Sequence, residues 1–200
     1  MINNFEIIKS YLDFSNPDTY YFLQLIQRRK DNPDLGKDMH IIDDIFIYNM
    51  EQYVRMESEI IATCKLHNAR GYFRLNKRSL KKSAMQLLKK VTTMIIDENY
   101  KSVKNAYSSV SGEFNDDNDK KWIVDIDNVI LDSNFGYNHE SMLCTLKNLQ
   151  IETGREPLIN LIPTKNGVHI ITRPFNVSKF KLMFPNIDIH KDNPTILYIP

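Results

Sequence analysis

The sequence has 200 residues, of which 42% are hydrophobic and 26% are charged. That length suits one globular domain, or two small modules that share a core. The formal net charge of +1 excludes a generally basic protein, so any contact with nucleic acid has to come from a local basic patch. No apolar run approaches the ~20 residues of a membrane-spanning helix. We therefore expect a cytoplasmic protein with no membrane partner.

The first half is predicted to alternate helices and strands. Apolar spacing and turn signals predict a short helix over 2–14, strands over 20–26 and 41–48, a helix over 51–66, a strand over 71–75 and a helix over 79–96. The helix over 79–96 has the clearest apolar stripe of the chain, a pattern typical of a helix that packs on a core. The stripe consists of Leu80, Ala84, Leu87, Leu88, Val91 and Ile95.

Residues 99–120 have the composition of a long loop and end in an acidic run, which makes them the expected boundary between halves 1–115 and 120–200. The second half is predicted to contain a strand over 122–126, a helix over 139–153, strands over 158–162 and 168–172, a helix over 177–184 and a strand over 196–199. Asn166-Gly167, between the two middle strands, is a strong hairpin signal. The elements indicate an α+β fold whose second half is roughly β-α-β-β-α-β.

The first candidate site is the acidic pair Asp125 and Asp127, at the end of the strand over 122–126. Because alternate residues of a strand point to the same side, the two carboxylates converge near the strand's C-terminal end. Carboxylates at close range repel each other, and a divalent cation such as Mg²⁺ relieves the repulsion by binding carboxylate and phosphate oxygens. The alternative is that one aspartate caps the following turn and the other is solvated.

The second candidate site is the turn and strand from Lys165 through Gly167 to His169. Its two cationic side chains are both expected to reach a triphosphate, and a glycine lets backbone N–H groups approach phosphate closely. The alternative is an ordinary hairpin turn with a surface lysine and a packed histidine.

A third acidic residue, Asp188, lies between two isoleucines just before the last predicted strand. Asp192 competes with it for the same role. His190, between the two, is a possible ligand, although a surface position is the stronger interpretation.

Basic residues cluster where the strand over 71–75 runs into the helix over 79–96. Aromatic and amide side chains interleave with them, a mixture that suits phosphate contact and base stacking. Positive charge at a helix N-terminus opposes the helix dipole, which favours an anionic partner over a merely solvated helix end. The cluster consists of Arg70, Arg74, Lys77, Arg78, Lys81 and Lys82, with Tyr72, Phe73 and Asn76 between them.

Taken in order, these motifs resemble the catalytic core of the archaeo-eukaryotic primase superfamily, also called AEP or PrimPol-like. That family has a strand ending in DxD or DxE, then a helix, then a strand carrying SxH that often follows a lysine, and finally an acidic residue between apolar ones. The residues that match the three motifs are Asp125 and Asp127, then Lys165, Gly167 and His169, then Asp188. Gly167 stands where the family usually has serine. The resemblance covers roughly residues 70–200.

The resemblance implies a single primase-like catalytic domain over 1–200. An N-terminal α/β module in 1–115 would contact nucleic acid, and an RRM-like half in 120–200 would hold metal and nucleotide. It also implies a primase or polymerase type of nucleotidyltransferase that acts in DNA replication or repair with two Mg²⁺ or Mn²⁺ ions. The implied partners are single-stranded DNA template and nucleoside triphosphates, with a helicase or accessory primase subunit as a further partner. A phage or mobile-element origin would fit such a minimal replication enzyme.

The resemblance also assigns roles to residues. The implied metal ligands are Asp125, Asp127 and Asp188, which with His169 form the implied catalytic set. The implied nucleotide-binding residues are Lys165, Gly167, His169, Arg74, Arg78 and Arg173. The implied nucleic-acid-binding residues are Arg70, Tyr72, Asn76, Lys77, Lys81 and Lys82.

Two other interpretations stay open. The run from Asp125 to Asp132 resembles the nucleophile loop of haloacid-dehalogenase-type phosphatases, and Ile170–Thr172 resembles their second motif. Against this, 124 residues precede the loop, and the threonine strand is the second arm of a predicted hairpin. The other interpretation is a non-catalytic nucleic-acid-binding module on a primase-like scaffold.

Overall fold

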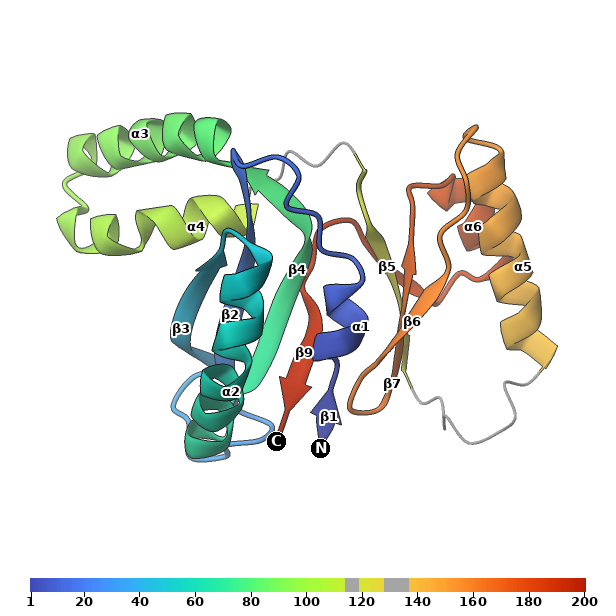
Figure 1. Ribbon diagram of the computed structural model, residues 1–200, viewed down its shortest axis with the longest axis horizontal. Helices are drawn as coiled ribbons and strands as arrows, with labels where there is room; N and C mark the ends of the chain where they lie inside the picture. Colours follow the sequence, from blue (N-terminus) through green and yellow to red (C-terminus); the bar gives the residue numbers. More distant parts are fainter. Residues whose placement is uncertain (114–118, 128–136) are drawn as a thin grey trace.

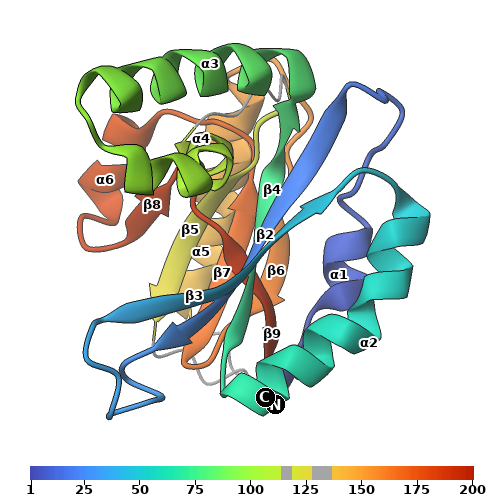
Figure 2. The same ribbon diagram turned by 90° about the vertical axis from the view of Figure 1, so that its left-hand side faces the viewer.

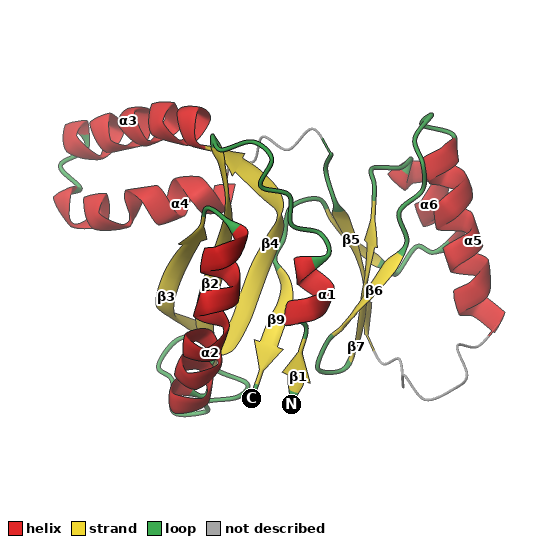
Figure 3. Cartoon of the chain, in the orientation of Figure 1, coloured by secondary structure: helices red, strands yellow, loops and turns green. Residues whose placement is uncertain are grey.

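The computed structural model describes residues 1–113, 119–127 and 137–200 and shows a mixed α+β protein with two antiparallel sheets (Figures 1 and 3). The first sheet has the strand order β1-β9-β4-β2-β3 and the second has the order β6-β7-β5-β8. The strands of the first sheet are Ile2–Asn3 (β1), Thr19–Arg28 (β2), Met39–Ile47 (β3), Arg70–Ser79 (β4) and Thr195–Ile199 (β9). Those of the second are Trp122–Asp127 (β5), Asn160–Pro163 (β6), Gly167–Thr172 (β7) and Asp188–His190 (β8). The predicted α+β class is confirmed.

The helices cover three of the sheet faces. They are Phe5–Lys9 (α1), Met50–His67 (α2), Leu80–Ile96 (α3), Ala106–Glu113 (α4), Tyr137–Ile151 (α5) and Val177–Met183 (α6), with a 3₁₀ helix over Tyr100–Asn105 (η1). Helices α1 and α2 lie on one side of the first sheet, and α3 and α4 lie on the other (Figure 2). Helices α5 and α6 cover the face of the second sheet that is turned away from the first (Figure 1). None of these described helices is long and apolar enough to cross a membrane.

The main hydrophobic core joins the two sheets. Side-chain alternation along β2 and β4 turns Leu23 and Phe73 toward α2, and Tyr53 of α2 packs edge-on against Phe73 with 5.9 Å between ring centroids. The same cluster includes Ile123 and Ile171 from the second sheet. Because burial of apolar side chains is the dominant favourable term in folding, this shared core holds the two sheets together.

The predicted hairpin forms between β6 and β7, with Ile162 opposite His169. The last predicted strand also forms as β9, but it pairs with β1 and β4 of the first sheet. The fourth strand of the second sheet is instead β8, whose three residues are too few to show a strand periodicity. Residues 122–190 therefore have the order β-α-β-β-α-β. The strands before the boundary near 115–120 all belong to the first sheet. Of the strands after it, β5 to β8 form the second sheet and β9 joins the first.

Residues 99–120 are not a long loop, because they include η1 and α4. That prediction was wrong because α4 is poor in helix formers, with three serines and one glycine among its eight residues. Tertiary packing stabilises it instead. Ala106, Val110 and Ser111 are buried, and Tyr107 stacks on Tyr20 of β2 with 6.0 Å between ring centroids.

The helix over 79–96 forms as α3, but its apolar stripe is less buried than the spacing predicts. Ser83 is the one buried residue that α3 contributes, whereas Leu88 is 71% exposed and Ile95 is 51% exposed. The helix packs on α4 and η1 and touches the sheet chiefly where it leaves β4. A single layer of helix covers only part of the stripe, so the rest faces outward.

The first prediction concerns Gly167, which pairs with Asp127 at the end of the β5–β7 ladder. A β-carbon added at Gly167 would lie 1.9 Å from the carbonyl oxygen of Ile126, so any side chain forces the two strands apart. We expect Gly167→Ala to lower the free energy of unfolding by more than about 2 kcal/mol in urea titrations. Gly36→Ala is the matched control, because nothing lies within 4 Å of its added β-carbon. Equal stability of the two variants would contradict the close approach.

Candidate active site

A cavity of about 280 Å³ lies between the two sheets, lined by β4, β5, β7 and β9 and by the β6–β7 turn. Acidic, basic and imidazole groups from segments far apart in the sequence share its wall. The charged and imidazole residues of the lining are Arg28, Lys30, Arg70, Asp125, Asp127, Lys165, His169 and His190. This mixture of opposite charges beside titratable rings makes the cavity the candidate active site.

Strand pairing assembles the acidic part of the site. Strand β5 lies between β7 and β8, so Asp125 is directly opposite both His169 and Asp188. Residues in such pairs project from the same face of a sheet, and Asp127 shares this face by alternation. Asp125, Asp127 and His169 line the cavity, while Asp188 is exposed on the neighbouring strand. The structure therefore brings three of the four predicted catalytic residues into one pocket, with the fourth next to them.

The imidazole of His169 has a partner at each nitrogen. Its Nδ1 is 2.8 Å from Oγ1 of Thr195, a buried residue of β9, and its Nε2 is 3.4 Å from Oδ1 of Asp125. Burial lowers the pKa of His169 below its ordinary value; the charge of Asp125 opposes this shift, and that of His190 adds to it. The ring is therefore neutral at neutral pH. The tautomer with its proton on Nε2 accepts a hydrogen bond from Thr195 and donates toward Asp125.

His190 is part of the site, although the sequence favoured a surface position. Its Nε2 lies 3.9 Å from Oδ2 of Asp125, and its Nδ1 is 3.0 Å from the side-chain amide nitrogen of Asn193. Asp125 thus sits between two imidazoles. Alternation from Asp188 would have placed His190 on the same face, had β8 been recognised as a strand.

A group of cations lines the rim of the cavity. Lys165, in the β6–β7 turn, lies 2.7 Å from a carboxylate oxygen of Asp31, which also binds Arg70 through two hydrogen bonds. Arg28 and Lys30 complete the group. Burial lowers the pKa of Lys30, and the positive charges of Arg70 and Arg28 lower it further. Sequence reasoning missed Arg28, at the end of β2, and Lys30 and Asp31, in the connection to β3, because all three are far from every motif in the sequence.

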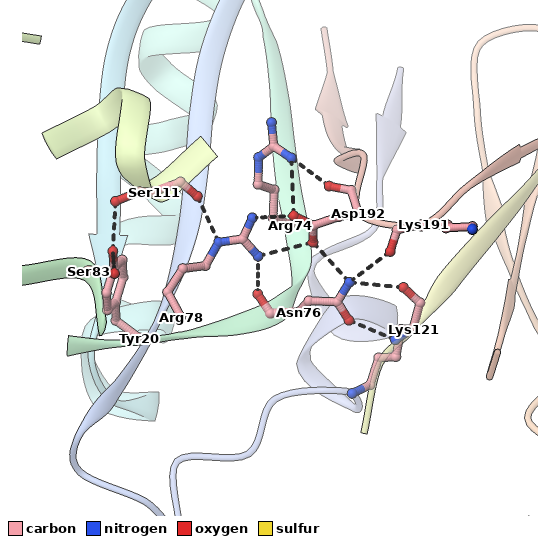
Figure 4. A network of polar contacts seen from close by, with 9 residues as sticks. All are labelled: Tyr20, Arg74, Asn76, Arg78, Ser83, Ser111, Lys121, Lys191 and Asp192. Carbon is pink, nitrogen blue, oxygen red and sulfur yellow. Dashed lines mark hydrogen bonds and ion pairs between the residues drawn. The ribbon is translucent and has the colours of Figure 1, made fainter. Parts of the chain in front are cut away.

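Arg78 and Arg74 are not part of the cavity, and the structure gives them a different role (Figure 4). The side chain of Arg78 is fully buried, and its Nη2 lies 2.8 Å from Oδ2 of Asp192. Its Nε donates to the carbonyl oxygen of Ser111 in α4, and Arg74 donates to the carbonyl oxygen of Asp192. A fully buried guanidinium has no surface to offer a nucleotide, so we correct the expectation for Arg78. Asp192 is equally engaged, which leaves Asp188 as the third acidic residue near Asp125.

Asn76 extends this network to the second sheet (Figure 4). Its side-chain nitrogen is 2.9 Å from Oδ1 of Asp192, and its side-chain oxygen accepts from the backbone N–H of Lys121, just before β5. Asn76 is itself buried. The expectation that Asn76 contacts nucleic acid is therefore corrected as well, because its polar atoms are used inside the protein.

The other predicted binding residues are dispersed. Tyr72 lines the cavity, whereas Lys77 and Arg173 each bind an aspartate elsewhere. Lys81 and Lys82 are exposed in the first turn of α3. The basic cluster of the sequence is thus divided among the cavity, the buried network and the outer surface. Arg70 and Tyr72 lie at the start of β4 beside the cavity, whereas Asn76 and Arg78 lie on the same face further along the strand, in the network.

The resemblance assigns a divalent cation to Asp125, Asp127 and Asp188, and the first two of these carboxylates line the cavity. Oxygen donors from a strand end suit Mg²⁺ or Mn²⁺, and Asp125 is only 28% exposed, so its charge is costly to bury without a counter-charge. Within the described part of the chain, no group of three or more His, Cys, Asp or Glu side chains is arranged to hold a metal ion. A bound cation would therefore use two protein carboxylates together with oxygens of a ligand or water.

Comparison with known proteins adds no family assignment. No protein-family model matches the chain, and no curated protein and no solved structure matches it.

The second prediction tests the buried network. We expect Arg78→Met to lower the free energy of unfolding by about 3–5 kcal/mol, because it leaves the partly buried carboxylate of Asp192 without its main partner. The measurement is urea unfolding followed by circular dichroism. Lys179→Met is the matched control, since its ion pair with Glu152 at 2.7 Å is half-exposed and should contribute about 0–1 kcal/mol. A loss for Arg78→Met no larger than that of the control would contradict the role of the network.

Proposed function

We propose that this chain is a primase- or polymerase-type nucleotidyltransferase that adds nucleotides on a nucleic-acid template with the help of Mg²⁺ or Mn²⁺. One observation carries the proposal. Asp125, Asp127, His169 and Lys165, which the sequence separates by up to 44 positions, line one cavity beside further cations. Carboxylates for a divalent cation and cations for a polyphosphate are the two requirements of nucleotidyl transfer.

The arrangement of the second sheet supports the proposal. Its elements run β-α-β-β-α-β, its spatial order is β6-β7-β5-β8, and every pairing is antiparallel. This is the arrangement expected of an RRM-like half in a primase-like core. The acidic pair ends the central strand β5, and the histidine lies opposite it on β7, as the resemblance of the motifs implies.

The proposed roles follow from the geometry of the side chains. A divalent ion bound at Asp125 and Asp127 would supply charge neutralisation and activation of a 3′-hydroxyl. His169, neutral and oriented by Thr195, would donate a hydrogen bond from Nε2 to a phosphate oxygen in place of Asp125. Lys165 would contribute its positive charge to the same polyphosphate. Template contacts are assigned to the exposed cations of α3, Lys81 and Lys82.

The phosphatase alternative fits the structure less well. In open α/β sheets, active sites lie at the carboxyl ends of parallel strands, whereas Asp125 lies on a strand that is antiparallel to both of its neighbours. Thr172 is fully buried at the end of β7, opposite Trp122 and far along the ladder from Asp127. The hydroxyl of Thr172 would therefore not lie beside a phosphate near Asp127.

The third prediction tests catalysis directly. Asp125→Ala/Asp127→Ala should reduce metal-dependent incorporation of labelled nucleotide on a single-stranded template by on the order of a thousandfold or more, because it removes the proposed metal ligands. Glu59→Ala/Glu140→Ala removes the same charge from exposed positions on α2 and α5 and should leave incorporation unchanged. Incorporation that survives in the aspartate variant would refute the assignment. A folded wild-type protein that incorporates nothing, but binds single-stranded DNA, would favour the binding-module alternative.

The fourth prediction concerns Thr195, a positioning residue that contacts His169 from the other sheet. Thr195→Val keeps the shape of the side chain but removes the hydroxyl that hydrogen-bonds Nδ1 of His169 and orients its ring. We expect kcat for incorporation to fall about tenfold with KM for template unchanged. Thr195→Ser, which restores a hydroxyl, should recover most of the loss. Equal kcat in the valine variant and the wild type would show that the hydrogen bond does not orient the ring.

A further inference from the structure

Asp31 occupies the middle of the cation group at the rim of the cavity. Its carboxylate lies 2.7 Å from Lys165 Nζ and accepts hydrogen bonds from Nε and Nη2 of Arg70 at 2.7 and 2.8 Å. Asp31 comes from the β2–β3 connection, Arg70 from the start of β4 and Lys165 from the β6–β7 turn. One carboxylate therefore links the first sheet to the hairpin of the second, across the mouth of the cavity.

We propose that Asp31 is an internal counter-anion that holds the place of a ligand phosphate, and that a polyphosphate binds here by taking Lys165 from Asp31. This inference rests on the proposed function, because it concerns regulation of the same site. It makes binding of the polyphosphate an exchange of one anion for another.

The charges around Asp31 support the exchange. Arg28, Lys30, Arg70 and Lys165 all line the cavity, and Asp31 is the carboxylate that the structure places in contact with two of them. With Asp125 and Asp127 in the same lining, three carboxylates face these four cations, which leaves an excess of one positive charge. The lowered pKa of Lys30, caused by burial and by the charges of Arg70 and Arg28, is a sign of that excess. A ligand with several negative charges would relieve it better than Asp31 does.

The two cations bound to Asp31 differ in how far their side chains are exposed and held by hydrogen bonds. The side chain of Arg70 is 6% exposed and held by paired hydrogen bonds, whereas that of Lys165 is 51% exposed on a turn. Arg70 therefore stays with Asp31, and Lys165 is the partner that is free to turn toward a ligand. Breaking the half-exposed ion pair between Lys165 and Asp31 costs little free energy. The several negative charges of a triphosphate would offset this cost more fully than those of a single phosphate.

The test uses inorganic tripolyphosphate as the probe, titrated calorimetrically into the full chain without divalent metal so that only the protein's cations are measured. Asp31→Asn removes the competing charge, and we expect it to bind tripolyphosphate about tenfold more tightly than the wild type. Asp13→Asn is the matched control. It makes the same charge change at the ion pair between Asp13 and Lys77. At 3.3 Å per residue, Lys77 lies roughly 23 Å along β4 from Arg70. This variant should therefore change the affinity for tripolyphosphate less than about twofold. Unchanged or weaker binding by a folded Asp31→Asn variant would overturn the proposal.

Lys165→Gln keeps the test decisive if Asp31→Asn fails to fold. Asp31 keeps Arg70 in this variant, and Lys165 is half-exposed, so the fold should be retained. We expect tripolyphosphate to bind about tenfold more weakly, and unchanged affinity would overturn the proposal. The two hypotheses also fail separately. If the protein incorporates no nucleotide but shows both affinity shifts, the proposed function is wrong and the role of Asp31 as a counter-anion stands. If the protein is active but shows neither shift, only the role of Asp31 is wrong.

Discussion

The buried ion pair between Arg78 and Asp192 is the contact on which the arrangement of the site depends. Arg78 belongs to β4 in the first sheet, and Asp192 belongs to the connection between β8 and β9. Asn76 joins the same carboxylate to the residue that precedes β5. One anion thus fixes the point at which the chain crosses between the sheets. Because a buried charge without a partner is costly, this junction is expected to be specific as well as tight.

The candidate site depends on that junction because both sheets contribute to it. His169 lies on β7 of the second sheet, but its ring is oriented by Thr195, which is on β9 of the first. His190 lies two residues before Asp192 and Asn193 follows it directly, so both are in the segment that the ion pair holds. A shift at the crossing would therefore displace the groups on two sides of Asp125. Asp192, which the sequence offered as an alternative third metal ligand, therefore has a structural role, because its carboxylate binds Arg78 and Asn76.

The sequence predicted what local patterns encode and missed what distant contacts decide. Most strands and the β6–β7 hairpin were found because apolar runs and an Asn-Gly turn are local signals. The acidic pair and His169 were grouped into one candidate site from their residue types and order, and the structure places them in one cavity. Helix α4 was missed because packing against Tyr20 stabilises a segment of low helix propensity. Arg78 was misassigned because its partners, Ser111 in α4 and Asp192 before β9, are distant in the sequence. Asp31 belongs to no sequence motif, because its contacts with Arg70 and Lys165 form only when three distant segments come together in the fold.

The proposed function requires that the cavity between the two sheets bind a divalent cation and a polyphosphate together. The most direct measurement is a crystal structure with Mn²⁺ and a non-hydrolysable nucleoside triphosphate, using the anomalous signal of manganese to locate the ion. We expect an anomalous peak beside the carboxylates of Asp125 and Asp127, with the triphosphate directed toward Lys165 and Arg70. Manganese and nucleotide bound elsewhere on the molecule, with this cavity empty, would contradict it.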